Sequence, residues 1–219
     1  MLTSIMEQLM NGLRTGSIYA LIALGYTMVY GIAKMINFAH GDIIMVGAYT
    51  LYIGIALLHL PVIAAMILTA AVCSILGVLI EKVAYKPLRK APPLAVLITA
   101  IGMSYFLQSV ALLIFTSTPI PFRSVIDLEA VQVGSVNISG ITIVTLVVTT
   151  VIMVCLTLFI NKTKAGSAMR AVSEDRGAAE LMGINVNRTI SRTFAIGSAL
   201  AAAAGILYIC QSPSCPVYT

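Results

Sequence analysis

Residues 62–81 read VIAAMILTAAVCSILGVLIE, a run that carries no charged side chain before Glu81. A helix needs about 20 mainly apolar residues to cross a hydrocarbon layer of about 30 Å. This run has that length, and we expect it to span a membrane. Five further stretches share its apolar character, at about residues 9–31, 42–60, 94–116, 140–160 and 190–210.

The composition supports the same interpretation. Hydrophobic residues make up 59% of the chain and charged residues 10%, with a mean hydropathy of +1.01. A water-soluble domain carries roughly 25% charged residues. We therefore expect an all-α, polytopic transmembrane helix bundle with about six spans, in which residues 1–219 form a single membrane domain surrounded by lipid.

The basic residues predict how this bundle is oriented. Of the 13 Lys and Arg residues, ten lie in segments 82–90 and 162–192. Such clusters stay on the cytoplasmic side of a membrane. Segment 117–139 has one basic and two acidic residues, so we expect it outside, together with the N-terminus. Because the net charge of +5 follows from these two loops, it does not indicate nucleic-acid binding.

The motifs of common enzymes and metal sites are absent from the sequence. No GxxxxGK[ST] loop occurs, and neither does HExxH. The four Cys and two His residues lack the spacing of a metal site. We expect no enzyme activity, no metal and no cofactor in this chain. Cys210 and Cys215 could pair only in an oxidising compartment.

Small residues recur at four-residue spacing in two of the expected spans. One row joins Gly12, Gly16 and Ala20, and another joins Gly197, Ala201 and Gly205. Small residues allow helices in lipid to approach closely. Packing within the bundle is the simpler interpretation, and a closely packed seam beside a pore is the alternative.

Segment 161–189 is the longest polar stretch between two spans, and residues 165–188 read AGSAMRAVSEDRGAAELMGINVNR. Ser173 is a suitable N-cap, and the two acidic residues after it would stabilise the first turn of a helix. We expect one further helical turn before it, near residues 166–172.

The end of this short helix is also predicted by the sequence. Gly183 suits the left-handed position that closes a helix, and Ile184 can fold back in a Schellman motif. Asn187 would then cap the following span. A solvated amphipathic loop is the simpler alternative. Caps at both ends favour a helix that serves as a docking element for a cytoplasmic partner.

This segment resembles the cytoplasmic coupling loop of ATP-binding cassette importer permeases, which carries a Glu-Ala-Ala…Gly pattern. The resemblance implies that the segment docks onto an ATPase subunit. Some of its side chains would make apolar contacts with the ATPase, and others would form a polar rim around those contacts. The residues that it assigns to this coupling are Met169, Val172, Glu174, Arg176, Ala178, Ala179, Leu181, Met182 and Gly183.

A second informative stretch lies between the first two spans, where residues 25–42 read GYTMVYGIAKMINFAHGD. Polar groups in lipid face an aqueous path or another helix. Gly31 and Gly41 would permit a broken or re-entrant backbone there. An ordinary cytoplasmic turn is the alternative.

This stretch resembles the branched-chain amino acid permeases of ATP-binding cassette importers, as do EKVAYKPLR at 81–89, AIGMS at 100–104 and LMGIN at 181–185. The resemblance covers about residues 9–208. The family has about eight spans, so we expect this chain to be cut short at its C-terminus. The resemblance implies four kinds of partner: a homologous second permease, two cytoplasmic ATPases that bind ATP-Mg, an external substrate-binding protein and membrane lipid.

The resemblance further implies a bacterial or archaeal inner membrane, and a translocation path for amino acids. The candidate path residues are Tyr30, Asn37, His40, Ser104 and Gln108. An ion-coupled secondary carrier of small polar solutes is the main alternative. It would need acidic residues within the membrane, and Asp42 is the one acidic residue near a span, at the edge of its segment. A membrane scaffold without transport activity is a second alternative.

Overall fold

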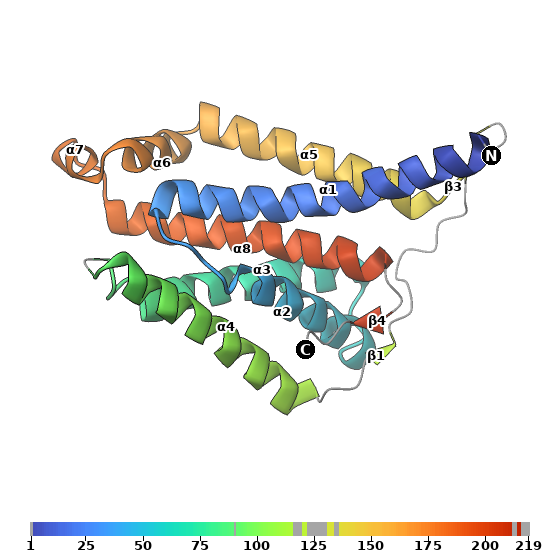
Figure 1. Cartoon of the computed structure of the whole chain (residues 1–219), viewed down its shortest axis with the longest axis horizontal. Coiled ribbons are helices and arrows are strands. Elements are labelled where there is room, and N and C mark those ends of the chain that lie inside the picture. Colours follow the sequence, from blue (N-terminus) through green and yellow to red (C-terminus); the bar gives the residue numbers. More distant parts are fainter. Residues whose placement is uncertain are drawn as a thin grey trace.

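The computed structural model is a bundle of helices that run lengthwise beside one another (Figure 1). Residues 2–89, 91–115, 120–121, 131–133, 136–211 and 214–215 are described. The helices are α1 (Leu2–Ala33), α2 (His40–Tyr52), α3 (Val62–Ile80), α4 (Pro93–Phe115), α5 (Gly140–Lys162), α6 (Lys164–Glu174), α7 (Arg176–Leu181) and α8 (Val186–Gln211).

One π-helical turn continues α2 and another continues α3, at Ile53–Leu57 and Glu81–Tyr85 respectively. Four very short strands form two antiparallel pairs. They are β1 (Ile120–Pro121) with β4 (Ser214–Cys215), and β2 (Val131–Val133) with β3 (Val136–Ile138).

Among the described residues, six helices are long and apolar enough to cross a membrane. The predicted all-α bundle with six spans is therefore confirmed. The first span is longer than the expected 9–31 and covers Ser4–Ala33. The second begins at His40 and ends at Leu57, somewhat earlier than expected. Most of segment 117–139 lies outside the described residues.

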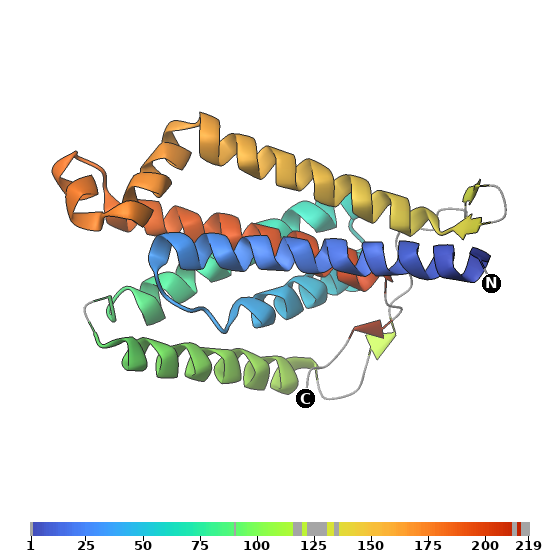
Figure 2. The same cartoon turned by 45° about the horizontal axis from the view of Figure 1, so that its top comes forward.

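Helix α8 is the centre of the bundle. In an apolar 18-residue stretch of its span 72% of the residues are buried, against 17% in the corresponding stretch of α4 and 11% in that of α5. Figure 2 shows α8 running beside α1, and it also packs against α2 and α3. The exposed side chains of α4 and α5 are mainly large and apolar, such as Leu113 at 84% exposure, which suits a lipid environment.

The row of small residues on α8 is a packing seam. A Cβ atom at Gly197 would lie 2.6 Å from Val29 Cγ2 of α1, and one at Gly205 would lie 2.8 Å from the Ile44 carbonyl oxygen of α2. Larger residues at either position would separate the helices. Gly12 and Gly16 differ, because a Cβ at either one meets no atom within 4 Å. Among the described residues, therefore, no other helix packs closely against Gly12 or Gly16.

The connection between α1 and α2 re-enters the bundle. Helix α1 ends at Ala33, Lys34 adopts a left-handed φ of 51°, and α2 begins at His40, whose ring lies against Gly25. Gly25 precedes Ala33 by eight residues, which corresponds to about 12 Å of helix. Residues 34–39 thus run back beside α1, as a re-entrant backbone and not as an outer turn. The break falls at Lys34, while both Gly31 and Gly41 are helical.

Candidate functional site

The polar segment after α5 folds into two short helices that extend beyond the spans (Figure 1). Helix α6 is capped by Thr163, whose Oγ1 accepts a hydrogen bond of 3.0 Å from the Gly166 amide. Helix α7 is capped by Asp175, whose Oδ1 accepts from the amides of Gly177 at 2.7 Å and Ala178 at 3.1 Å. The segment is therefore helical and capped, as the sequence predicts.

The identity of the cap differs from the prediction. Ser173 lies in the last turn of α6, where its hydroxyl donates to the Arg170 carbonyl at 2.7 Å. Asp175 takes the capping role because its backbone is extended, with φ of −146° and ψ of 116°. Ser173 was a plausible cap by residue type alone. The chain keeps α6 helical up to Glu174, which excludes Ser173 from that role.

The C-terminal end of α7 forms the predicted Schellman motif. Gly183 has a φ of 80°, and its amide donates to the Glu180 carbonyl at 2.9 Å. The Ile184 amide reaches the Ala179 carbonyl at 3.0 Å. The predicted N-cap of α8, Asn187, is wrong by two residues. The cap is Asn185, whose Oδ1 accepts a hydrogen bond of 2.9 Å from the Arg188 amide.

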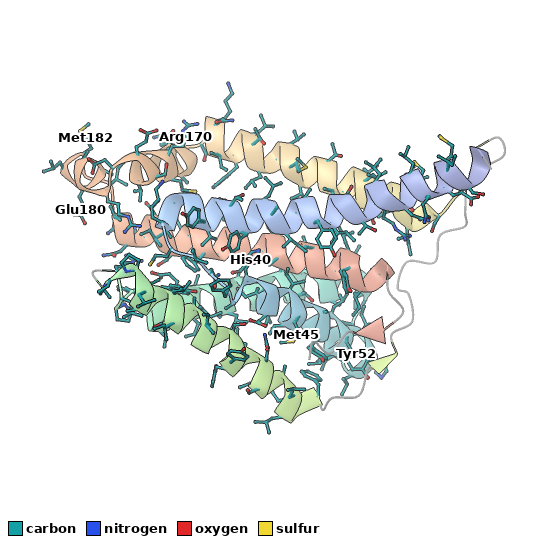
Figure 3. The ribbon with its side chains drawn as sticks, viewed as in Figure 1. His40, Met45, Tyr52, Arg170, Glu180 and Met182 are labelled. Atoms are coloured by element: carbon teal, nitrogen blue, oxygen red, sulfur yellow. The ribbon has the colours of Figure 1, made fainter. Side chains whose placement is uncertain are left out.

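The predicted coupling residues divide into two groups. Leu181 and Met182 are 91% and 82% exposed, although both are large and apolar. Figure 3 shows Met182 and Glu180 at the far tip of the molecule. The exposed group also contains three smaller or charged residues, Glu174, Ala178 and Gly183.

The second group is buried inside this chain. Met169, Val172 and Ala179 are 1%, 1% and 3% exposed and belong to the main hydrophobic core. Met169 and Val172, which were predicted as apolar contacts to an ATPase, are therefore covered by this chain itself. The two residues face the spans because α6 lies across the ends of α1, α5 and α8. They hold the two short helices against the bundle.

Arg176 also points inward, not toward a rim. Its guanidinium donates a hydrogen bond to the carbonyl of Ala33, the last residue of α1. Partial burial, and secondarily the neighbouring Arg89 guanidinium, lowers the pKa of Arg176 below its ordinary value. This bond connects the first residue of α7 to the point where α1 breaks.

A polar junction lies beside this bond, defined by Glu81, Arg89, Asn187 and Ser191. Glu81 is fully buried and pairs with Arg89, and it accepts a 2.6 Å hydrogen bond from the Ser191 hydroxyl. Arg89 also donates to Asn187 Oδ1. The junction joins the end of α3 to the start of α8. The sequence analysis did not predict this junction. The sequence does contain a signal for it, because Glu81 ends an apolar run and lies eight residues before Arg89.

The predicted path residues do not form one site. Asn37 and His40 line a cavity between α1 and the start of α2, and Asn37 Oδ1 accepts a 3.1 Å hydrogen bond from the Tyr85 hydroxyl. Tyr30 lines another cavity, of about 490 Å³, together with Arg89 and Arg176.

Ser104 and Gln108 lie elsewhere, on α4. Gln108 Nε2 donates to Asp42 Oδ1 at 2.9 Å and to Ser104 Oγ at 3.2 Å. Asp42 lies near the start of the second span, at the edge where it was expected. Its side chain is buried there, at 6% exposure. This polar cluster therefore ties α4 to α2.

These features define a class of protein: a multi-pass membrane protein with a helix interrupted inside its bundle and a capped, partly apolar helix outside it. The particular family follows from comparison with known sequences. The family model described as the permease component of branched-chain amino acid transport systems matches residues 8–218. The chain belongs to this family.

Individual relatives support the assignment. The chain is 45% identical over 214 residues to the high-affinity branched-chain amino acid transport system permease protein BraD of Pseudomonas aeruginosa. It is 43% identical over 215 residues to the corresponding protein LivH of Escherichia coli strain K12. Each match covers 92% of this chain and 70% of the relative.

A more distant relative is the probable permease protein LivH of Methanocaldococcus jannaschii, at 29% identity over 198 residues, or 86% of this chain and 61% of that protein. No solved structure matches the chain. Permease components of this family are transport subunits of multi-subunit systems, so this chain is a membrane transport subunit and not itself an enzyme.

Proposed function

We propose that this chain is a permease subunit of an ATP-binding cassette importer that moves branched-chain amino acids across a bacterial or archaeal inner membrane. The substrate class is that of the relatives with 43–45% identity. The proposed partners are a homologous second permease, two ATPases that bind ATP-Mg and an external substrate-binding protein. The N-terminus would lie outside, since the basic loops at 82–90 and 162–192 favour the cytoplasmic side.

The observation that carries the ATPase contact is the exposed pair Leu181 and Met182 at the tip of α7. Exposed large apolar side chains on a polar, water-facing segment mark a site of protein contact. The cap at Asp175 and the Schellman motif at Gly183 hold this tip in one conformation. A tip that is held in one conformation can transmit the movement of the ATPases when they close around ATP.

The contact from Arg176 to Ala33 gives this tip a direct connection to the membrane. A movement of α7 would reach the end of α1, and with it the re-entrant residues 34–39. The polar junction at Glu81 would carry the same movement to α3 and α8. This is how ATP-driven closure would change access to the substrate path.

The test uses the full chain in its complex, reconstituted in vesicles with the binding protein outside. Leu181→Asp places a charge on the apolar tip, and Gly183→Pro forbids the φ of 80° because proline fixes φ near −65°. We expect both variants to lose ATP-driven leucine uptake. We also expect the ATPases to dissociate from these variants during purification of the complex.

Leu58→Asp is the matched control, because Leu58 is 57% exposed on the loop between α2 and α3. It makes the same chemical change away from α7, and we expect it to retain ATPase binding. Normal uptake by both tip variants would reject the docking role. Uptake that persists without ATP and collapses with an ion gradient would instead support the secondary carrier.

A further inference from the structure

A cavity of about 490 Å³ lies where the end of α1, the start of α4 and the first residue of α7 come together. Three of its lining side chains are cations: Lys34, Arg89 and Arg176. The other walls are mainly apolar and include Leu94 and Leu97 of α4. Among the described residues that line this cavity, none is acidic. Ligand sites in proteins have volumes of about 300–1,000 Å³, so this cavity suits an anion that also has an apolar part.

The positive charge of the cavity is only partly neutralised by the protein itself. Within the described part of the chain, Arg89 forms an ion pair with Glu81, whereas Lys34 and Arg176 have no carboxylate partner. The Arg176 guanidinium donates to the Ala33 carbonyl, which is a neutral acceptor. Two positive charges around the cavity therefore remain without a negative partner.

The placement of these cations is unfavourable unless an anion lies between them. Partial burial, and secondarily the neighbouring Arg89 guanidinium, lowers the pKa of Arg176, which is the effect of a like charge nearby. Lys34 has a left-handed φ of 51°, which is strained for a residue with a Cβ atom, and such strain is concentrated at functional sites. Glu174 lines a different cavity beside Lys34 and forms no ion pair with it.

The cavity lies at one end of the membrane-spanning helices, where lipid headgroups are found. The first span ends at Ala33 and the fourth begins at Pro93. Figure 1 shows the start of α4 at the same end of the bundle as α6 and α7. The basic loops at 82–90 and 162–192 favour the cytoplasmic side for this end. Basic pockets between spanning helices on that side bind the headgroups of anionic lipids.

An exposed apolar stripe continues from the cavity along α4. Leu94 lines the cavity and is 66% exposed. Ile98, Ile101 and Tyr105 follow at intervals that place them on the same helix face, and they are 61%, 40% and 66% exposed. An acyl chain can lie along this stripe while the phosphate of the same molecule contacts the cations. A soluble phosphate would leave the stripe uncovered, so a phospholipid matches the site better.

We propose that this cavity is a binding site for an anionic phospholipid. The three cations hold the phosphate, and an acyl chain lies along the exposed stripe of α4. The bound phosphate also joins Lys34, in the connection between α1 and α2, to Arg176 at the start of α7. The assignment goes beyond the proposed function, because the site binds lipid whichever solute the complex transports.

The first experiment measures lipid binding to the purified full chain by native mass spectrometry in detergent. Phosphatidylglycerol is the anionic probe, and phosphatidylcholine with the same acyl chains is the zwitterionic control. We expect the chain to retain phosphatidylglycerol and to bind phosphatidylcholine much more weakly, because only the first lipid has a net negative charge.

Variants of Lys34 connect this binding to the cavity. Lys34→Gln should weaken phosphatidylglycerol binding about fivefold, as expected when one basic residue beside an anionic lipid is removed. Lys34 is exposed, so the change leaves the core intact. Lys34→Arg keeps the charge and should keep the affinity. Lys86→Gln is the matched control, because Lys86 is also exposed, lies in the same basic loop as Arg89 and does not line the cavity.

The second experiment locates the bound lipid in the assembled complex. A phosphatidylglycerol with a photoreactive group in one acyl chain should label peptides that contain residues 94–105. Unlabelled phosphatidylglycerol should compete with this labelling. Inorganic phosphate and glycerophosphoglycerol, which is the same headgroup without acyl chains, should compete much more weakly.

Each of the other outcomes would overturn the assignment. Equal retention of the two lipids, or equal binding by Lys34→Gln and Lys86→Gln, would show that the cations do not select an anionic lipid. Competition by inorganic phosphate as strong as by the lipid would mean that the cavity takes a soluble anion. Labelling of α4 in the isolated chain but not in the complex would mean that a partner subunit covers the cavity. None of these measurements requires leucine uptake, so a failure of the proposed function is observed separately.

Discussion

Helices α7 and α2 differ at their N-termini, because α7 has a side-chain cap and α2 has none. Helix α7 begins outside the spans with Asp175, whose carboxylate satisfies two of its first amides. Helix α2 begins inside the bundle after Ala39, with no side-chain cap and with a cavity beside it. The first amides of α7 already have a hydrogen-bond acceptor in Asp175. The part of α7 available for contact with a partner is its exposed C-terminal tip. Helix α2 instead carries a buried carboxylate, Asp42, in its first turn.

The polar junction at Glu81 joins the end of α3 to the start of α8, and breaking it should have the largest effect on stability. Glu81→Ala would leave the Arg89 guanidinium, which is 13% exposed, without its partner. Removing one member of a buried ion pair costs about 3–5 kcal/mol. We expect a much lower thermal unfolding temperature in detergent.

Lys82→Ala serves as the control for this variant, because Lys82 is exposed on the same turn. A surface change of this kind alters stability by about 0.5 kcal/mol or less. Equal unfolding temperatures for the two variants would mean that the junction does not hold α3 to α8.

A smaller effect is expected at the capped terminus. Asp175→Ala removes both capping hydrogen bonds of α7 and should destabilise this helix by about 1 kcal/mol. We expect faster amide hydrogen exchange across residues 176–182 and about fivefold weaker ATPase binding. Ser173→Ala should change neither, because Ser173 bonds within α6. A reversed order for these two variants would show that Ser173 is the cap.

The sequence predicted well what depends on patterns along the chain. Apolar runs of membrane length located all six confirmed spans, and Gly183 identified the left-handed end of α7. These features are local, because each depends on residues within one helix or turn.

Contacts between distant residues explain what the sequence could not predict. Asp175 replaced Ser173 as the cap because α6 continues to Glu174. Met169 and Val172 are buried because α6 folds onto the spans. Glu81 is 110 residues away from Ser191 in the chain, and Gln108 is 66 residues away from Asp42. The hydrophobic periodicity of a single helix does not indicate which distant residues will form such contacts.

The most direct test of the proposed ATPase contact compares Leu181→Asp with Leu58→Asp in one assay. Leucine uptake and ATP hydrolysis would be measured together in vesicles that contain the complete complex and the binding protein. We predict that Leu181→Asp loses both activities, because the ATPases no longer engage α7, and that Leu58→Asp keeps both. Equal activities in the two variants would contradict the role of α7 as the contact with the ATPases.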